Sequence, residues 1–258
     1  MLVSLDRIAR AERLRDYFDL QLRFAQAVAE VGGLPIADAI ARYTNFHRRF
    51  GLGRLQDVPC SAEWARYSRQ LSLLQTHEQQ VEWTHAFFLQ SPEESPPATQ
   101  RQFGCFSCDP PNEQGMVRIH FTNRDNHNGT GPLNRAKIGR RKRELKEMFM
   151  YVRSTYPSAK SVKGGSWLYH LQAYRRLFPL EYAESREILK VGLRFDGTSS
   201  WGQFLDHREC IRPALRDVFL RNIRDLDMDN LWRAFPLPAL GTNAPIQVFY
   251  DFYHHELT

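Results

Sequence analysis

The chain has 258 residues, 42% of them hydrophobic and 25% charged, and a mass of 30.2 kDa. This is the composition of a globular protein with a sizeable core, and it excludes a wholly disordered chain, a collagen and a coiled-coil rod. No apolar run reaches the ~18 residues of a membrane-spanning helix. The N-terminus lacks the apolar segment of a secretory signal, and four cysteines are too few for a disulfide scaffold. These features predict a cytoplasmic protein without a membrane span.

Positive charge is concentrated in one segment. The net charge is +6, yet residues 1–100 hold 11 basic and 12 acidic residues, against 24 and 17 in residues 101–258. Residues 133–163 alone hold ten basic residues and two acidic ones. Such a cluster attracts anions, whether nucleic acid, acidic lipid or a phosphorylated cofactor. A solvated helix face is an equally good explanation of a charge run.

The first part of the chain predicts a helical domain over residues 1–90. Three helices are expected, with apolar residues at steps of three and four: residues 5–30, 35–51 and 61–88. Ser61 is a favourable N-cap for the third helix. Proline and serine are frequent from residue 90 to residue 100 and are incompatible with a helix. We therefore expect a linker over residues 91–103.

Strands alternating with helices are predicted over residues 104–258. The expected strands are 116–122, 161–169, 188–195 and 246–253, the last of them rich in β-branched and aromatic residues. The expected helices are 133–156, 171–178 and 204–224. This alternation is typical of an α/β domain with a partly parallel sheet. The predicted fold class is α/β (α+β), a helical N-terminal domain followed by a mixed-sheet domain.

A polar loop with two glycines joins the first strand of this second domain to the next helix. Gly129 and Gly131 allow a sharp turn with consecutive exposed N–H groups, which together with the positive end of the helix form a phosphate site. The candidate phosphate ligands lie in this loop or early in the helix: Arg124, Asn126, Gly129, Thr130, Gly131, Arg135, Lys137, Arg140 and Arg141. The loop is neither a Walker motif nor a dinucleotide fingerprint. A β–α turn without a ligand is the alternative interpretation.

The spacing Asn126-x-x-Gly129-x-Gly131 resembles the acyl-CoA pyrophosphate loop of the GNAT acyltransferases, usually written Q/R-x-x-G-x-G/A, with asparagine at the first position. Some bacterial proteins that join an all-helical N-terminal domain to a GNAT-like domain show similar motifs over residues 116–180. Their counterparts here are Ile119-His120-Phe121, Gly131-Pro132-Leu133, Tyr156-Pro157 and Ser166-Trp167-Leu168-Tyr169. The resemblance implies a GNAT-like fold for residues 104–258. It also implies acyl-CoA as co-substrate and an amine or hydroxyl acceptor on a small molecule or peptide.

His120 is the candidate general base. Apolar residues alternate on one face of its strand, which places His120 on the other face beside the glycine loop. A histidine that is merely hydrogen-bonded on a sheet face is the alternative. Ser166 is not a hydrolase nucleophile, because the G-x-S-x-G motif of hydrolases is absent. Its hydroxyl is expected either to bind a ligand or to cap a turn. The GNAT resemblance implies a tyrosine that protonates the leaving thiolate, with Tyr250 and Tyr253 as candidates.

No metal is expected. Cys105-x-x-Cys108 is a single pair, whereas structural zinc needs four ligands, so ordinary thiols are favoured. Glu82-x-x-His85 matches one half of a diiron motif whose second half is missing. Two functions other than acyl transfer stay open, nucleic-acid binding through the basic helix 133–156 and a non-catalytic adaptor role. The sequence leaves the acyl chain and the oligomeric state undetermined.

Overall fold

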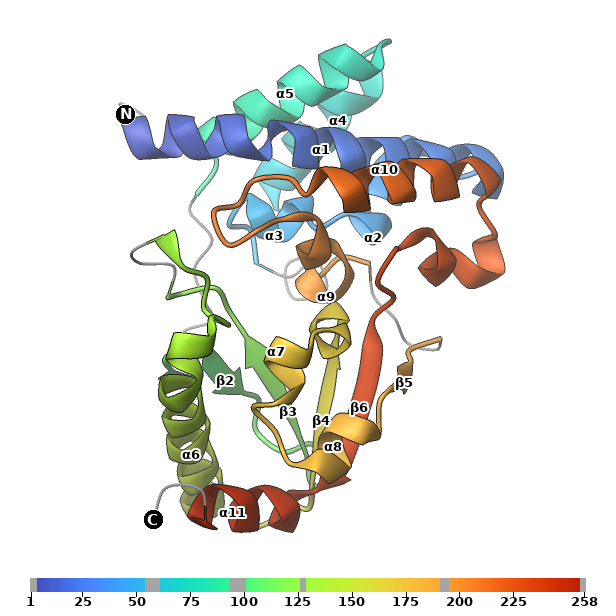
Figure 1. The fold of residues 1–258 in the computed structure, drawn as a ribbon. Helices are drawn as coiled ribbons and strands as arrows, with labels where there is room; N and C mark the ends of the chain where they lie inside the picture. The colour runs from blue at the N-terminus through green and yellow to red at the C-terminus, as the bar shows by residue number, and fades with distance from the viewer. Residues whose placement is uncertain (1–3, 54–60, 93–100, 126–128, 191–194, 256–258) are drawn as a thin grey trace. The chain divides into compact units, whose positions relative to one another are not determined.

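The computed structural model describes residues 4–53, 61–92, 101–125, 129–190 and 195–255 (Figure 1). The chain divides into two compact units. Unit 1 comprises residues 1–96 and 190–237 and is helical, and unit 2 comprises residues 97–189 and 238–258 and contains a six-stranded mixed sheet. The predicted α+β class is confirmed. Among the described residues, no helix has both the length and the apolar character needed to cross a membrane.

Unit 1 is built around one long helix, α1 (Leu5–Gly32). Its other helices are α2 (Ile36–Tyr43), α3 (Phe46–Arg49), α4 (Ala62–Leu73), α5 (His77–Gln90), α9 (Thr198–Trp201) and α10 (Pro213–Asn222). Within its described residues, 3-10 turns accompany them: η4 (Gly202–Phe204), η5 (Ile223–Asp225) and η6 (Met228–Ala234). Helices α2 and α5 pack directly against α1 (Figure 1). The helix expected over residues 35–51 is thus two short ones, α2 and α3.

The helix expected over residues 61–88 is also two helices. Ser61 caps α4 as predicted, because its hydroxyl accepts the backbone N–H of Trp64 at 3.1 Å. A second start signal lies inside the expected helix. The Thr76 hydroxyl accepts the N–H of Gln79, and the Gln79 side chain accepts the N–H of Thr76. This capping box begins α5 and separates it from α4.

The core of unit 1 joins segments from both parts of its sequence. Phe24 on α1 is fully buried, and four rings from the later segment surround it at centroid distances of 5.4–6.1 Å: Phe195, Trp201, Phe219 and Phe235. Because large buried rings dominate core energetics, residues 190–237 belong to the helical unit. The sequence placed them in the domain 104–258 instead. The predicted linker falls mainly outside the described residues.

Helix α10 begins at Pro213, whereas the sequence predicted a helix from residue 204. The residues between form a loop that is held in place by the carboxylate of Glu209. Glu209 in this loop has a φ of +61°, in the left-handed region. Its carboxylate accepts hydrogen bonds from Arg10 at 2.6 and 2.8 Å and from Arg49 at 3.0 Å. Burial by itself raises the pKa of Glu209, but the two arginines outweigh it and hold the pKa at about 2.

We predict that Glu209 makes unit 1 sensitive to acid. Its pKa in the folded protein lies below the ordinary value of about 4.3. Its stabilisation is therefore complete above about pH 5 and is lost as the pH falls toward 2. Urea unfolding of the wild type is expected to show a loss on the order of 2 kcal/mol over this range from Glu209 alone. Glu209→Gln lacks that component and is less stable at neutral pH.

The matched control for this prediction is Glu63→Gln, at an exposed position of α4. This variant is expected to keep the pH dependence of the wild type. A Glu209→Gln protein with the same pH dependence as the wild type would contradict the assignment.

The sheet of unit 2 has the strand order β1-β2-β3-β4-β6-β5. Its strands are β1 (Gln102–Phe103), β2 (Phe106–Cys108), β3 (Met116–Phe121), β4 (Ser161–Ser166), β5 (Glu187–Ile188) and β6 (Leu240–Pro245). The helices and 3-10 turns are η2 (Arg135–Lys137), α6 (Ile138–Thr155), η3 (Trp167–His170), α7 (Gln172–Arg175), α8 (Leu180–Glu184) and α11 (Ile246–His255). Strands β3 and β4 are parallel and connected through α6, and the other neighbouring pairs are antiparallel. Of the strand expected over residues 188–195, only Ile188 lies in a strand, at the end of β5; residues 189, 190 and 195 are not in a strand, and residues 191–194 lie outside the described residues.

The helices of unit 2 cover one face of this sheet. Val117 and Val162 lie side by side on that face and pack in one core with residues of α6, α7, α8 and α11 (Figure 1). On the other face, Arg118 lies beside Lys163, which in turn lies beside Asn243, and all three are exposed. The unit is therefore a two-layer structure with one open sheet face.

The strand predicted over residues 246–253 is wrong, because this segment forms α11. Its buried residues, Ile246, Phe249 and Tyr253, recur at steps of three and four, which is a helical period. Gln247 and Asp251 lie on the exposed side and are joined by a hydrogen bond of 2.7 Å. The last strand in the chain is β6, whose glycine and polar residues had the composition of a turn. The sequence predicted a strand here because the segment is rich in aromatic and β-branched residues, and the helical spacing of its apolar residues was overlooked.

Candidate functional site

Strands β3 and β4 part halfway along their length. Ladder pairs join residues 116–118 to residues 161–163, and within the described chain no pair joins residues 119–121 to residues 164–166. Each of these later halves pairs only on its other side, with β2 and with β6. The facing edges therefore present backbone N–H and C=O groups outside the ladder. In open sheets with parallel strands, ligands bind outside the carboxyl ends of those strands, and β3 and β4 are the parallel pair of this otherwise antiparallel sheet.

His120 lies on the open sheet face at this parting. Its Nε2 is 2.9 Å from Oδ2 of Asp109, and Ser107 on β2 lies opposite it in register. The side chains of His120 and Asp109 are 29% and 31% exposed, so solvent reaches both. The two atoms are within ion-pair distance, but among the described residues His120 Nε2 forms no hydrogen bond. The sequence placed His120 on this face but missed Asp109, because only the pairing of β2 with β3 brings Asp109 there.

The loop after β3 is held by its own turn and by a lysine. Gly129 has a φ of +69°, as expected for a glycine turn. The N–H of Asn134 donates to the Gly131 carbonyl at 3.2 Å, and the Asn134 side chain caps η2. Lys137 donates from Nζ to the Thr130 carbonyl at 3.0 Å. Lys137, which the sequence assigned to a phosphate, thus stabilises the loop.

Beneath the loop lies a buried ion network around Arg141, whose side chain is only 1% exposed. Arg141 donates from Nη2 to Asp125 at 2.7 Å and to Glu144 at 2.8 Å. Lys137 and Arg140 each approach the Asp125 carboxylate at 3.1 Å. Three cations and two carboxylates therefore tie the loop to the first turn of α6.

Burial and charge act in opposite directions on the two carboxylates. Burial by itself raises the pKa of Asp125, but the hydrogen bond from Lys137 and the charges of Arg140 and Arg141 outweigh it, so the pKa is lowered. For Glu144, burial is the larger effect and raises the pKa, against the charge of Arg141 and a backbone hydrogen bond. Asp125 is thus the firmly ionised member of the network.

Gly104 lets the network reach the β1–β2 turn. Its φ is +60°, and a Cβ at this position would lie 2.0 Å from the carboxyl carbon of Glu144. Glu144 accepts the N–H of Cys105 at 3.0 Å, and the Cys105 thiol contacts the Arg141 guanidinium. Burial raises the pKa of the Cys105 thiol and raises that of Cys108 to about 11. Both are free thiols, and the described residues contain no cluster of three or more His, Cys, Asp or Glu able to hold a metal.

The remaining predicted phosphate ligands fall into two groups. Arg124 and Arg135 are exposed on either side of the loop. Arg140 has a side chain that is 58% exposed, but it shares its charge with Asp125 and with Glu144 at 3.5 Å. Asn126 lies outside the described residues. Arg124 and Arg135 are therefore exposed cations that flank the glycine loop in the sequence, while part of the basic segment is neutralised internally.

Ser166 does not join His120. It lies on the core side of β4, where its hydroxyl accepts a backbone N–H at 3.2 Å and caps η3. Gly164 on the same side has a packing role, because a Cβ there would lie 1.9 Å from the Tyr169 hydroxyl and 2.3 Å from that of Tyr182. These two buried hydroxyls are 2.7 Å apart. Gly164 and Ser166 therefore serve the core side of β4.

Neither tyrosine candidate is placed beside His120. Both lie on α11, which starts next to the amino end of β4, whereas the glycine loop follows the carboxyl end of β3. Tyr250 is half-buried with the Arg153 guanidinium 5.3 Å from its ring centre. Tyr253 is buried and donates its hydroxyl to the Leu177 carbonyl at 2.8 Å. The predicted acid therefore has no support from the geometry.

Comparisons with known proteins add no relative, since the chain matches no protein-family model, no curated protein and no solved structure.

We predict that Gly104→Ala destabilises unit 2 by about 3 kcal/mol or more. About 1–2 kcal/mol comes from a non-glycine residue in the left-handed region, and the rest from displacing Glu144 from its hydrogen bonds. Urea unfolding of the full chain measures the loss. The control is Gly33→Ala, because Gly33 has a φ of +63° and no atom lies within 4 Å of an added Cβ. Equal losses in the two variants would contradict a steric role for Gly104.

Proposed function

We propose that unit 2 binds an acyl-CoA thioester and transfers its acyl group to an amine or hydroxyl acceptor. The observation that carries the proposal is the parting of β3 and β4 beside His120 and the glycine loop. An extended ligand with amide groups suits such a place, because strand edges outside a ladder bind extended amides through main-chain hydrogen bonds. The pantetheine arm of coenzyme A is extended and contains two amides.

His120 is the proposed base. With Nε2 directed to Asp109, Nδ1 accepts the proton of the attacking amine or hydroxyl while the new bond to the thioester carbonyl forms. The carbon–sulfur bond then breaks, and the thiolate of coenzyme A leaves with a proton from solvent. Asp109 is the proposed positioning residue, since its carboxylate lies 2.9 Å from Nε2 and attracts the imidazole once it is protonated. The mechanism assigns no step to Ser166 or Tyr250.

The phosphates of coenzyme A are proposed to lie at the glycine loop. Loop residues 129–131 belong to the segment that follows the carboxyl end of β3, and the exposed Arg124 and Arg135 add positive charge before and after them in the sequence. Charge-assisted hydrogen bonds from arginine to phosphate are among the stronger polar contacts of proteins. Arg140 attracts phosphate less strongly than these two arginines, because its guanidinium is already paired with Asp125.

Titration of the full chain with coenzyme A and acetyl-CoA, by calorimetry at low and physiological salt, tests the proposal. Saturable binding is expected in both buffers, and Gly131→Glu is expected to abolish it, because an added carboxylate repels the phosphates. Gly139→Glu is the control, since it adds the same charge on α6 where the nearest atom to a new Cβ is 3.7 Å away. His120→Ala is expected to keep the affinity and lose transfer.

Two results would overturn this function. One is the absence of binding heat in either buffer. The other is an equal loss of affinity in Gly131→Glu and Gly139→Glu, which would show a general charge effect and not a site at the loop.

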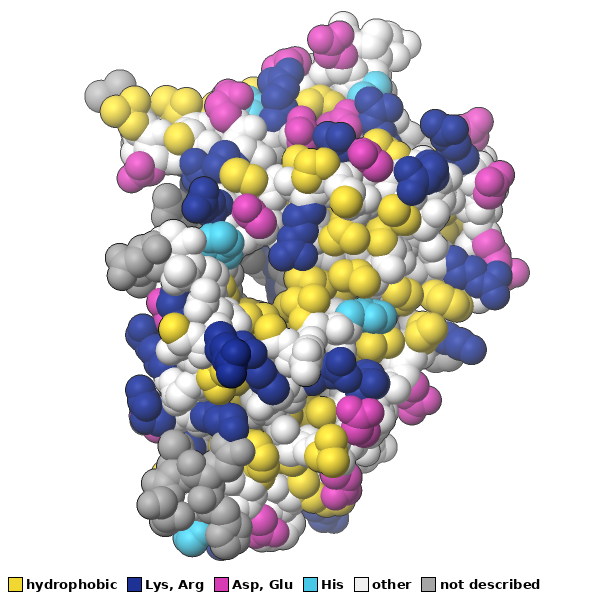
Figure 2. Space-filling model, in the orientation of Figure 1, with side chains coloured by type: hydrophobic (Ala, Val, Ile, Leu, Met, Phe, Trp, Pro, Cys, Tyr) yellow, Lys and Arg dark blue, Asp and Glu magenta, His cyan; other side chains and the backbone are white. Residues whose placement is uncertain are grey.

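A second candidate function, polynucleotide binding, is favoured by one face of α6. Arg143, Lys146 and Arg153 lie along this face at steps of three and seven, and none has an ion pair among the described residues. Figure 2 shows Lys and Arg side chains over the part of unit 2 that α6 forms. Since Arg140 and Arg141 belong to the buried network, the surface available to phosphates is narrower than the basic segment suggested.

For this candidate we predict binding of an oligonucleotide that weakens steeply with salt, measured by fluorescence anisotropy. Reversing Arg143, Lys146 and Arg153 to Glu is expected to reduce the slope of log affinity against log salt by about 2–3. The control reverses three exposed arginines of unit 1, Arg208, Arg221 and Arg224, for the same change in net charge. Equal effects of the two triple variants would exclude a site on α6.

A further inference from the structure

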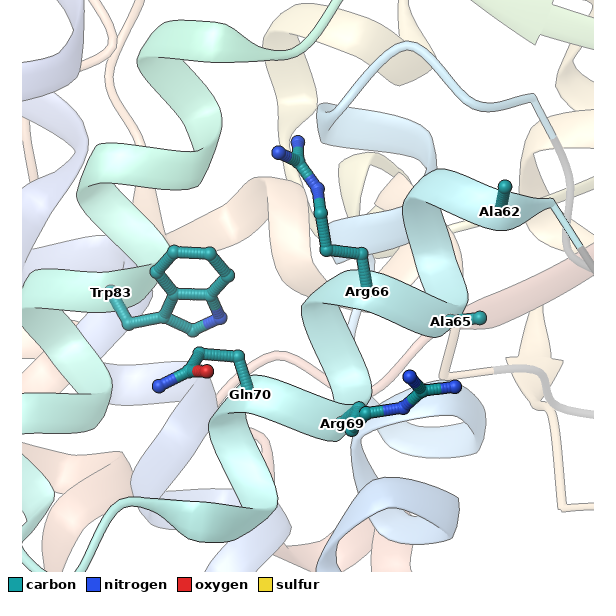
Figure 3. Close-up of a pocket in the computed structure, with 6 residues that line it drawn as sticks. All are labelled: Ala62, Ala65, Arg66, Arg69, Gln70 and Trp83. Atoms are coloured by element: carbon teal, nitrogen blue, oxygen red, sulfur yellow. The ribbon is translucent and has the colours of Figure 1, made fainter.

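Unit 1 contains a hollow between α4 and α5 with a volume of about 480 Å³. Figure 3 shows its lining residues, Ala62, Ala65, Arg66, Arg69, Gln70 and Trp83. The five residues from α4 recur at steps of three, one, three and one, so they form one face of the helix, and Trp83 faces them from α5. The volume lies within the range of about 300–1,000 Å³ typical of small-molecule sites. The two alanines leave this space open.

Trp83 provides a fixed aromatic wall. Its indole N–H donates to the Tyr67 carbonyl at 3.1 Å, and its ring is nearly parallel to that of Tyr67, with an angle of 11° between the planes. Phe87 supports the indole at a centroid distance of 5.7 Å. The side chain is only partly buried, so ring surface remains available. A fixed, partly exposed indole suits stacking with a planar ring at low entropic cost.

Arg66 and Arg69 give the hollow a positive charge. Both are exposed, and Arg66 is held over the Phe87 ring at 5.0 Å. In the part of the chain that the structure describes, neither guanidinium forms an ion pair with a carboxylate. On the neighbouring α1, by contrast, Arg15 and Arg23 are both paired. The cations at the hollow are thus available to an anion from solution.

From these features we infer that unit 1 binds a nucleotide in the hollow, with the base stacked on Trp83 and the phosphates at Arg66 and Arg69. The Gln70 side chain lies beside the indole (Figure 3), where its amide has both a donor and an acceptor for the edge of a base. A nucleotide has both an aromatic base, which can stack on Trp83, and phosphates, which can pair with Arg66 and Arg69. The site lies in unit 1 and does not depend on the acyl transfer proposed for unit 2.

The experiment is calorimetric titration of the full chain with ATP, AMP, adenosine and inorganic phosphate. ATP is expected to bind saturably and more tightly than either adenosine or phosphate, because it has both ring and charge. Arg66→Gln and Arg69→Gln are each expected to weaken ATP binding about tenfold, the effect of losing one charge-assisted contact. Arg13→Gln, an exposed arginine of α1, is the charge control and is expected to leave ATP binding unchanged.

Ala65→Leu keeps the test independent of charge and of folding, because leucine is a good helix former at this exposed position of α4. It fills the hollow and is expected to abolish ATP binding while coenzyme A binding, where present, persists. Ala214→Leu makes the same change at an exposed position of α10 and is expected to have no effect. Gly131→Glu distinguishes the two proposals, since it should spare ATP binding at the hollow.

Three outcomes would overturn the inference. They are no saturable binding of ATP, an Ala65→Leu protein with wild-type affinity for ATP, and inorganic phosphate that binds as tightly as ATP. The last would show attraction of an anion by two arginines with no role for the indole.

Discussion

A buried guanidinium is the constraint on which the structure of unit 2 depends. Arg141 is removed from solvent, and a buried charge without carboxylates beside it would cost several kcal/mol. Asp125 comes from the loop and Glu144 from the next turn of α6, while Gly104 leaves room for the Glu144 carboxylate. One cation therefore links the loop after β3, the start of α6 and the β1–β2 turn. The β1–β2 turn also meets the carboxyl end of β3, where the N–H of Thr122 donates to the Cys105 carbonyl at 2.8 Å.

The same network divides the basic segment into two kinds of cation. Lys137 and Arg141 serve the interior and fix the loop, whereas Arg135 and Arg143 are exposed and available to anions. The high local charge of this segment thus includes cations that stabilise the interior and cations that lie on the surface. Because the interior carboxylates neutralise part of the charge, the exposed cations of this segment are fewer than the sequence suggests, and they include residues on α6, beside the loop and, as Lys163, on the open sheet face.

Unit 1 depends on a different constraint, the burial of aromatic rings around Phe24. The rings that surround it come from residues 190–237, so the chain must leave unit 1, form most of unit 2 and return before this core is complete. Glu209 belongs to the returning segment and is held by Arg10 and Arg49 in a strained conformation. Ionic and aromatic contacts thus both join the returning segment to the first part of the chain.

Much of the local structure was predictable from the sequence, because it depends on neighbouring residues. The period of apolar residues predicted α1 and α6, Ser61 predicted the start of α4, and alternation placed His120 on the open face of β3. The capping box at Thr76 was present in the sequence as well, and the helical period of residues 246–253 was masked by their aromatic content. These features need no knowledge of distant contacts.

The remaining features were decided only by the tertiary structure. The pairing of β2 with β3 brings Asp109 to His120. The carboxylates of Asp125 and Glu144 point into the unit, and Arg141 is buried beside them. The separation of Tyr250 from His120 follows from the helix at the end of the chain. Each of these facts joins residues far apart in sequence or depends on which side of an element faces the core. A sequence fixes local periods and caps, whereas the partners of a charge or a ring depend on how the elements pack.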